Sequence, residues 1–507
     1  CTSLVVVIVG NTSLNVAIPT IQRELGATQT ALQWMVDSYA LVFAGLLLTA
    51  GAIGDRFGRK GALQAGLGIF FLGSLLAGMV GSTGGIIAMR ALMGVGAAFV
   101  MPGTLSILAN VFPPEERPKA IAIWAGLSGA GGAIGPIASG YLLNHFSYGS
   151  VFFVNLPIIA VALVAGHVLL PRSRDTAQTR LDPVGAGLTN VGLSTIVYAI
   201  IEAPTHGWAS GRTLGTAVAG VAVLAVFAWW ELRTDHPMLD LRFFENPRFS
   251  VAAGGVTLIF FTMFGMFFLI TQYFQLVLGY TPLGAGLRQI PVAVALMLTA
   301  PNSARLVQRF GPKLTVAGGL ALVAGGLLLM MGAGVDTPYA YIALAMVVLA
   351  SGMGLVIAPL TASIMGSLPL GKAGVGSAVN DTTRELGGAL GVAVLGSLLQ
   401  STYTGRIGEV AALPDAVREV ASTSLGAALA AAGRLAQADP AAAGRLADAA
   451  REGYVSGMHL ALAVAASVAV LAAALVLRYL PGKGEAGAAA MAGAPDRRAT
   501  SIEPEAA

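Results

Sequence analysis

Long apolar segments recur along the whole chain, separated by short polar stretches. A helix that crosses about 30 Å of hydrocarbon needs about 20 apolar residues, and fourteen segments of this kind can be delimited. They cover residues 2–21, 32–53, 62–81, 84–111, 120–144, 151–170, 183–203, 213–231, 250–272, 283–303, 314–333, 339–364, 378–400 and 455–479. The pattern predicts an all-α polytopic membrane protein with fourteen transmembrane helices.

Composition agrees with this pattern. The 507 residues are 56% hydrophobic and 11% charged, whereas soluble domains carry roughly 25% charged residues. The net charge is +4, but the basic residues fall singly or in small groups between apolar segments, so we expect no nucleic-acid partner. The one cysteine, Cys1, excludes an intrachain disulfide and a cysteine-ligated cluster, and we expect no metal site.

The first apolar segment begins almost at the start of the chain. We expect it to be a retained span behind a trimmed cytoplasmic leader. A cleavable signal peptide is the alternative, but no small-residue cleavage site precedes Pro19 and the next apolar segment follows almost at once.

Lys and Arg are distributed unevenly between the two sides of the predicted bundle. If the first helix runs outward, twenty of the 29 basic residues lie on the inner side, eight lie on the outer side, and Arg90 lies within a span. Because cytoplasmic loops are enriched in Lys and Arg, this predicts a cytoplasmic-membrane protein with both termini in the cytoplasm. Residues 401–454 then form an outer loop, expected to be an amphipathic helical hairpin, and residues 481–507 a disordered tail.

A short sequence repeat divides the chain. Arg56-Phe57-Gly58-Arg59-Lys60 follows the second segment, and Arg309-Phe310-Gly311-Pro312-Lys313 follows the tenth. Transporters are often built from such repeats. Eight helices separate the matching points, which predicts two six-helix halves, residues 1–170 and 250–480, around an inserted pair in residues 171–249. A chance basic turn is the alternative.

Several segments resemble a known family. The first loop, Gly51-Ala52-Ile53-Gly54-Asp55-Arg56-Phe57-Gly58-Arg59-Lys60, resembles the signature loop of the major facilitator superfamily, with Gln308 in place of the acid in the second copy. The fifth segment resembles the glycine-proline motif of its antiporters, with Ser139 at one glycine position. Residues 90–94, 380–388 and Gly207-Trp208 resemble the fourteen-span drug:proton antiporters.

The resemblance implies a transporter that exports drugs or other amphiphilic molecules by alternating access, driven by the proton gradient and without a cofactor. It also implies residues that gate the two conformations. These are Gly51, Asp55, Arg56, Gly58, Arg59, Gly131, Gly135, Pro136, Gly140, Asn380, Asp381 and Arg384. Gly10 stands where many members carry an acid within the membrane, so the resemblance assigns no proton carrier there.

Two ionisable residues lie deep within predicted spans, where charges are costly and usually functional. Asp37 and Arg90 each lie about six residues from the outer edge of a span, or roughly 10 Å deep. We interpret Asp37 as the coupling acid and Arg90 as its partner or gate. The alternative is that Asp37 faces outer water. Glu202, Asp381 and Glu385 lie near predicted helix ends and are weaker candidates for the coupling acid, with ordinary interfacial charges as the favoured alternative.

The ninth segment is rich in Phe and Met, which suit a roomy site for varied cationic or amphiphilic molecules. Packing against lipid or protein is the alternative for each of these side chains. The candidate substrate contacts are Phe261, Phe264, Phe268, Gln272 and Gln275 there, and Tyr39, Phe43, Trp124 and Asn155 in the first half.

Nothing in the sequence indicates an enzyme. The five histidines are scattered, and no HExxH, P-loop or GxSxG motif stands in a supporting context. A receptor or channel is the alternative from another class. Within transporters, the alternatives are an exporter of one metabolite or self-made antibiotic and a proton-coupled importer. We expect a monomer in the lipid bilayer, with protons and amphiphilic or cationic small molecules as partners.

Overall fold

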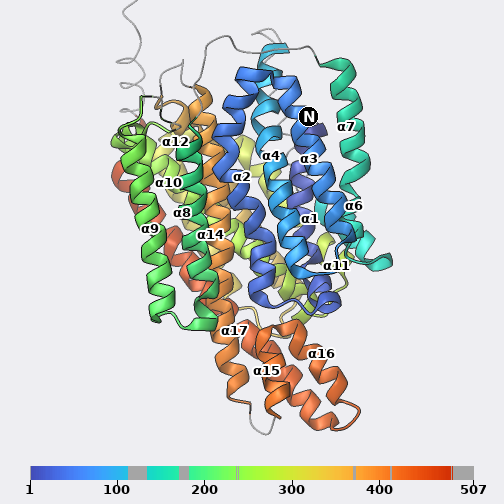
Figure 1. The fold of residues 1–507 in the computed structure, drawn as a ribbon. Coiled ribbons are helices and arrows are strands. Elements are labelled where there is room, and N and C mark those ends of the chain that lie inside the picture. The colour runs from blue at the N-terminus through green and yellow to red at the C-terminus, as the bar shows by residue number, and fades with distance from the viewer. Residues whose placement is uncertain are drawn as a thin grey trace, which may run out of the picture.

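The computed structural model describes residues 2–111, 134–170, 182–235, 237, 239–368, 373–410, 414–480 and 482–483. Within these ranges the regular structure is entirely helical, and twelve helices are long and apolar enough to cross a membrane. The predicted all-helical polytopic architecture is confirmed (Figure 1).

The helices follow the predicted order of apolar segments. The first half contains α1 (Thr2–Leu25), α2 (Gln29–Phe57), α3 (Arg59–Met79), α4 (Thr83–Val111), a helix over residues 134–145, α6 (Ser150–Phe153) and α7 (Asn155–Leu169). Next come α8 (Pro183–His206), α9 (Gly211–Glu231) and the short 3₁₀ helix η1 (Leu241–Glu245). The second half contains α10 (Pro247–Gln272), the π-helical turn η2 (Tyr273–Val277), α11 (Pro282–Leu287), α12 (Ile290–Met330), α13 (Tyr339–Met365), α14 (Ala373–Gly408), α15 (Asp415–Thr423), α16 (Leu425–Leu435) and α17 (Pro440–Tyr479).

One candidate span holds two predicted segments. Residues Pro282–Met330 form a single apolar stretch of 49 residues, which as one straight helix would be about 74 Å long, more than two hydrocarbon cores. Its backbone leaves the helical conformation at Gly311 (φ 86°, ψ 164°), where the two predicted segments join. The segment at 120–144 lies partly outside the described residues, so a total of fourteen spans stays a prediction.

Polar residues before the helices fix where several of them begin. The side chains of Thr28, Asp182 and Ser210 accept hydrogen bonds from backbone N–H groups three residues later. These N–H groups have no partner within their helix, so each cap stabilises a helix start.

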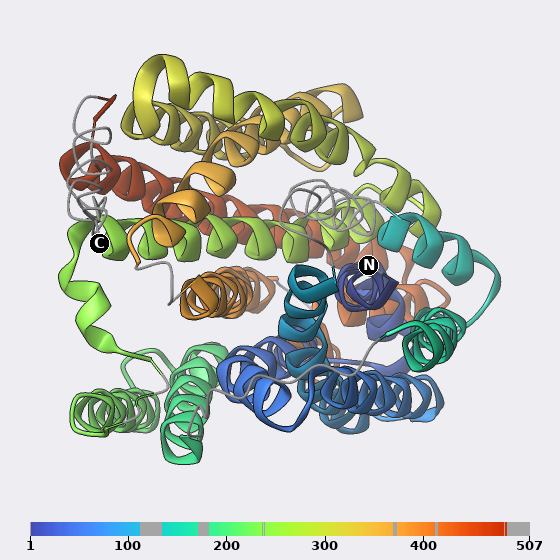
Figure 2. The same cartoon turned by 90° about the horizontal axis from the view of Figure 1, so that it is seen from above.

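The two halves face each other across a seam, seen from above in Figure 2. Helix α2 packs against α14, and α1 packs against α10, α11 and α16. The pair α8–α9 lies to one side, with α8 in contact with both α2 and α14. A small cluster buries Leu41 of α2, Val197 and Ile201 of α8, and Ala389 of α14. Helix α8 of the predicted inserted pair therefore touches both predicted halves.

Residues 401–454, here called the cap, project from one end of the bundle (Figure 1). They are largely helical, as predicted, but form more than a hairpin. Helix α14 continues to Gly408 and α17 begins at Pro440, while α15 and α16 fill the space between. We call this end of the bundle the cap end, and the end that carries Gly58 and Gly311 the loop end.

Hydrogen bonds join the two halves toward the cap end. The amide of Gln33 on α2 donates to the carbonyl oxygens of Val392 and Ala393 on α14, at 3.2 and 3.0 Å. The amide of Gln275 in η2 donates to the carbonyl oxygen of Val16 on α1, at 2.9 Å. In the described part of the chain, the seam is therefore closed at the cap end.

Candidate functional site

Arg90 on α4 is fully buried and contacts two other helices of the first half, α1 and α2. Its guanidinium donates to the carbonyl oxygen of Met35 at 3.0 Å, to that of Gly10 at 3.4 Å and to Oδ1 of Asn11 at 3.3 Å. Its Cζ also lies 4.3 Å from the centre of the Tyr39 ring. Carbonyl dipoles and an aromatic face both stabilise a cation, so Arg90 clamps α1, α2 and α4 together.

Asp37 on α2 is also fully buried, but it does not pair with Arg90. Neither of its carboxylate oxygens has a hydrogen-bond partner among the described residues, and no ion pair joins it to Arg90 there. The expected pairing is wrong because Arg90 binds at Met35 and Tyr39, one helical turn apart on α2. Asp37 lies between them in sequence and so points about 200° away from that face. Its role in coupling stays a prediction.

Glu385 lies further from the start of its helix than the sequence indicated. Helix α14 begins at Ala373 rather than at residue 378, so Asp381 and Glu385 lie inside the spanning helix and not at its end. The Glu385 carboxylate interacts electrostatically with Arg90 on α4 and with Arg384 and Asp381 on its own helix. The seam therefore places an acid of the second half within electrostatic range of the buried Arg of the first, although no ion pair joins the two side chains among the described residues.

The neighbouring polar residues on α14 form a network of their own. Asp381 pairs with Arg384 at 3.9 Å and accepts a hydrogen bond from the Asn380 amide at 3.4 Å. Asn380 in turn accepts a hydrogen bond from the hydroxyl of Thr361 on α13, at 3.0 Å. The Arg384 guanidinium lies 5.2 Å from the centre of the Phe260 ring on α10. These three predicted gate residues thus connect α14 to α10 and α13.

The first signature loop is a tight break between two helices. Gly58 has φ 121°, a backbone conformation that favours glycine, and Arg59 starts α3 directly after it. The Arg56 guanidinium lies 5.3 Å from the Phe57 ring centre. A Cβ on Gly51 would lie 3.5 Å from Cβ of Pro102, which shows close packing of α2 on α4. The Asp55 side chain lies outside the described part.

The predicted glycine-proline motif lies against both halves. Ser13 of α1 donates to the carbonyl oxygen of Gly135 at 3.4 Å. A Cβ on Gly140 would lie 2.7 Å from Cα of Leu283 on α11, and one on Gly286 of α11 would lie 2.5 Å from the carbonyl oxygen of Pro136. Small residues thus allow close contact across the seam at the cap end. Gly131 lies outside the described residues.

The candidate substrate contacts of the second half divide into two groups. Phe264 is half-buried, stacks on Phe260 at 6.1 Å, and approaches Gly388 of α14. Phe268, Gln272 and Gln275 are buried further toward the cap end, and Gln275 bonds the first half. Phe261 is also buried, with its backbone against Gly391 of α14.

The η2 turn orients part of this region. It has π-helical hydrogen bonding, with the Leu278 N–H donating to the carbonyl oxygen of Tyr273. Such a wide turn shifts the direction of the side chains after it and often lies at functional positions. Here it carries Gln275 to α1.

The candidates of the first half lie near Arg90. The Tyr39 and Phe43 ring centres are 5.7 Å apart. Neither amide atom of buried Asn155 has a partner among the described residues. A Cβ on Gly10 would lie 3.5 Å from the Asn155 amide nitrogen and 2.9 Å from Cζ of Phe70, so Phe70 restricts the space for a side chain at position 10. Trp124 lies outside the described residues.

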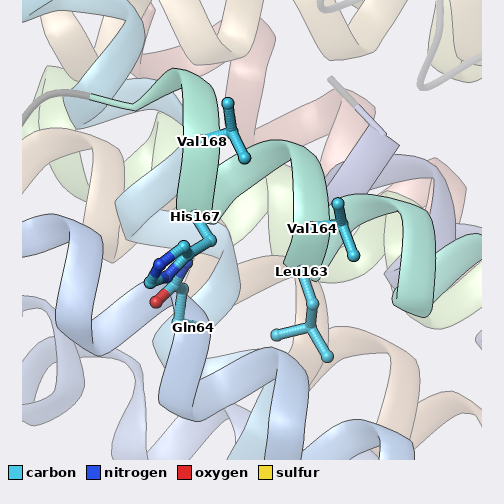
Figure 3. A pocket seen from close by; sticks show the side chains of 5 residues that line it. All are labelled: Gln64, Leu163, Val164, His167 and Val168. Carbon is cyan, nitrogen blue, oxygen red and sulfur yellow. The ribbon is translucent and has the colours of Figure 1, made fainter.

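A surface groove lies away from all these residues. Its volume is about 350 Å³, and it lies between α3 and α7, lined by Gln64, Leu163, Val164, His167 and Val168 (Figure 3). Val164 and Val168 are exposed, so the groove opens to the outside of the bundle. It lies apart from the candidate site at the seam.

Comparison with known proteins gives consistent results. The Major Facilitator Superfamily profile matches residues 1–392. A multidrug efflux pump of Mycolicibacterium smegmatis is 36% identical over 93% of this chain and 93% of its own length. The tetracenomycin C resistance and export protein of Streptomyces glaucescens is 34% identical over 94% of this chain and 89% of its own length.

Solved structures show the same fold. A bacterial homologue of the human lysosomal transporter Spinster superposes with a TM-score of 0.63 at 16% identity, covering 94% of this chain and 96% of that one. A D-xylose–proton symporter gives a TM-score of 0.60 at 13% identity, covering 95% and 97%. The helical arrangement described above is therefore shared with membrane transporters.

Proposed function

Because this chain belongs to the major facilitator superfamily, we propose that it exports drugs or other amphiphilic small molecules across the cytoplasmic membrane in exchange for protons. Its multi-pass helical fold is that of a transporter and not of an enzyme. The export activities named for its relatives in Mycolicibacterium and Streptomyces support efflux. The proton gradient is the energy source, and no cofactor takes part.

The distribution of Lys and Arg supports an orientation with the cap outside and both termini in the cytoplasm. In this orientation the hydrogen bonds of Gln33 and Gln275 close the outer side of the seam. The structure then corresponds to an inward-facing conformation, from which a substrate enters from the cytoplasm or the inner leaflet. Because one chain holds both halves and the whole candidate site, a monomer is sufficient for transport.

The observation that carries the proposed coupling is that Glu385 of the second half lies within electrostatic range of Arg90 of the first half. Arg90 is fixed by carbonyl groups and remains a cation, so the variable charge is that of Glu385. A proton and a cationic substrate compete for this one carboxylate, because protonation removes the charge that attracts the substrate. Such competition produces antiport. Asp37, buried without a described partner, is the second candidate for a proton site.

Replacing each acid by its neutral amide tests whether Glu385 or Asp37 carries the proton. In everted vesicles, a proton gradient should drive uptake of the cationic dye ethidium by the parent protein. Glu385→Gln should abolish this uptake, because a glutamine amide cannot gain and lose a proton. Asp37→Asn should reduce it if Asp37 carries a second proton. Glu202→Gln, at the end of α8 beside His206, is the matched control and should transport normally. Gradient-driven uptake by Glu385→Gln would refute the assignment.

A dedicated exporter of one antibiotic is the second candidate, favoured by the similarity to the tetracenomycin C export protein. A resistance panel in a pump-deficient host separates the two functions. Protection against many unrelated cations indicates a multidrug pump, whereas protection against one compound class indicates the dedicated exporter.

A further inference from the structure

The cap is hydrogen-bonded firmly to the second half. The hydroxyl of buried Tyr403 on α14 donates to the carbonyl oxygens of Ala421 and Ser424, at 2.9 and 3.2 Å. The Gln400 amide donates to the carbonyl oxygen of Ser422 at 2.8 Å. Helix α16 also packs along α17. The cap therefore moves with α14 and α17 as part of the second half.

The same cap also covers the end of α1 in the first half, but only by packing. Gly426 on α16 lies so close to Gln22 on α1 that a Cβ at position 426 would be 2.5 Å from Oε1 and 2.9 Å from Cγ of Gln22. Among the described residues, no hydrogen bond joins α16 to α1. Leu425 and Ala428 are buried on α16, as is Ala27 in the turn after α1. The contact depends on small side chains and close fit.

The Gln22 side chain is buried in this contact without a hydrogen-bond partner among the described residues. Its side chain is 2% exposed, and neither Nε2 nor Oε1 has a hydrogen-bond partner among the described residues. A buried amide without a partner destabilises the state that buries it. Withdrawal of α16 from α1 would expose Gln22 to water and remove this penalty. The contact thus holds the end of the seam closed without making opening prohibitive.

We propose that α16 is an extracytoplasmic latch, which must leave the end of α1 each time the outer side of the seam opens. The latch rests on the proposed alternating-access transport and adds a conformational control to it. Because the cap is bound to α14 and α17, the close approach of Gly426 to Gln22 sets the stability of the outward-closed state relative to the outward-open state.

A disulfide tests the latch directly. The only cysteine, Cys1, is replaced by Ser, and Gln22→Cys is combined with Gly426→Cys, where the side chains are close enough for a disulfide. Oxidation should abolish ethidium export, and reduction should restore it. The control pair is Arg406→Cys with Gly453→Cys, since a Cβ at 453 lies 3.3 Å from Cβ of Arg406. This disulfide joins α14 to α17 within the second half and should leave export unchanged.

The outcomes separate the latch from the proposed function. Full export by the oxidised Gln22–Gly426 pair would overturn the latch, as would equal loss in both oxidised pairs. If both reduced pairs and the Cys1→Ser parent fail to export, the proposed function fails.

A labelling assay tests the latch without any transported substrate. Ser397 on α14 is fully buried at the seam, where it accepts a hydrogen bond from Gln33 at 3.2 Å. In purified protein carrying Cys1→Ser and Ser397→Cys, addition of Gly426→Val should push α16 from α1 and increase the rate of maleimide labelling at position 397. Gly453→Val, which strains the cap inside the second half, should not. Equal labelling rates with and without Gly426→Val would overturn the latch even if export were normal.

Discussion

The loops at Gly58 and Gly311 have similar turns, but the lysine that anchors each loop lies in a different segment. In both, an Arg-Phe-Gly sequence places a glycine with positive φ between two helices, 121° at Gly58 and 86° at Gly311. In both, the Arg guanidinium lies 5.3 Å from the ring of the next Phe. The repeat read from the sequence is therefore also a repeat of local structure.

The anchoring lysines differ in origin. Lys60, within the first loop, donates to the carbonyl oxygens of His167 and Leu170 at the end of α7, at 2.7 and 2.8 Å. In the second half the lysine comes from the other side, because Lys483 after α17 donates to the carbonyl oxygen of Arg309 at 3.0 Å. Each loop is thus joined to the last helix of its own half. The turn depends on the local sequence, whereas the anchoring lysine can lie either in the loop itself or after the last helix of that half.

The largest expected difference between the loops concerns their glycines. Gly311→Ala should lower the free energy of unfolding by about 2–3 kcal/mol, since positive φ costs about 1–3 kcal/mol and the new Cβ would also lie 2.9 Å from the backbone nitrogen of Lys483. Gly58→Ala should cost about 1–3 kcal/mol for its backbone conformation. Thermal unfolding in detergent measures both. Gly318→Ala, with open space around its Cβ position, is the control and should cost nothing. A smaller loss at Gly311 than at Gly58 would contradict the comparison.

The next difference concerns the lysines. Lys60→Met removes two hydrogen bonds to carbonyl groups and should cost about 1 kcal/mol, a value reduced by the exposure of the ammonium group. Lys483→Met removes one such bond and should cost about half as much. The same unfolding measurement applies, and Lys313→Met on α12 is a comparison at another lysine of the second loop. A larger loss at Lys483 would show that the second loop depends more on its anchor than the first.

The smallest effect should come from the arginines. Arg56→Lys and Arg309→Lys each weaken one guanidinium–ring contact at the surface, worth about 0.5 kcal/mol. Because the guanidinium–ring distance is the same in the two contacts, the two losses in unfolding free energy should be equal within error. A clear inequality would show that the loops are alike only in their backbones.

Hydrophobic pattern predicted the spans because burial in lipid requires apolar residues, but it could not predict where helices end in water. Helix α17 begins at Pro440, fifteen residues before the predicted apolar segment. The added part is rich in Ala, which favours a helix without being strongly apolar. The same limit applies to α14, which begins at Ala373, five residues before its predicted apolar segment.

At the candidate site, the direction of the buried side chains was harder to predict than the residues themselves. Asp37 and Arg90 were expected to be deep in their helices, and both are fully buried. Their pairing was not predictable, because it depends on the rotation of each helix about its axis. The carbonyl oxygens of Gly10 and Met35 that bind Arg90 have no signature in the sequence, because every residue carries such a group.

The η2 turn lets one helical element serve two neighbours. Before it, Phe264 of α10 approaches α14, and within it, Gln275 donates to the carbonyl oxygen of Val16 on α1. The wider turn accommodates an extra residue, so the chain downstream is out of phase with the helix upstream. Deleting a single residue there would rotate every later side chain by about 100° about the helix axis. The element could then no longer contact α14 and α1 at the same time.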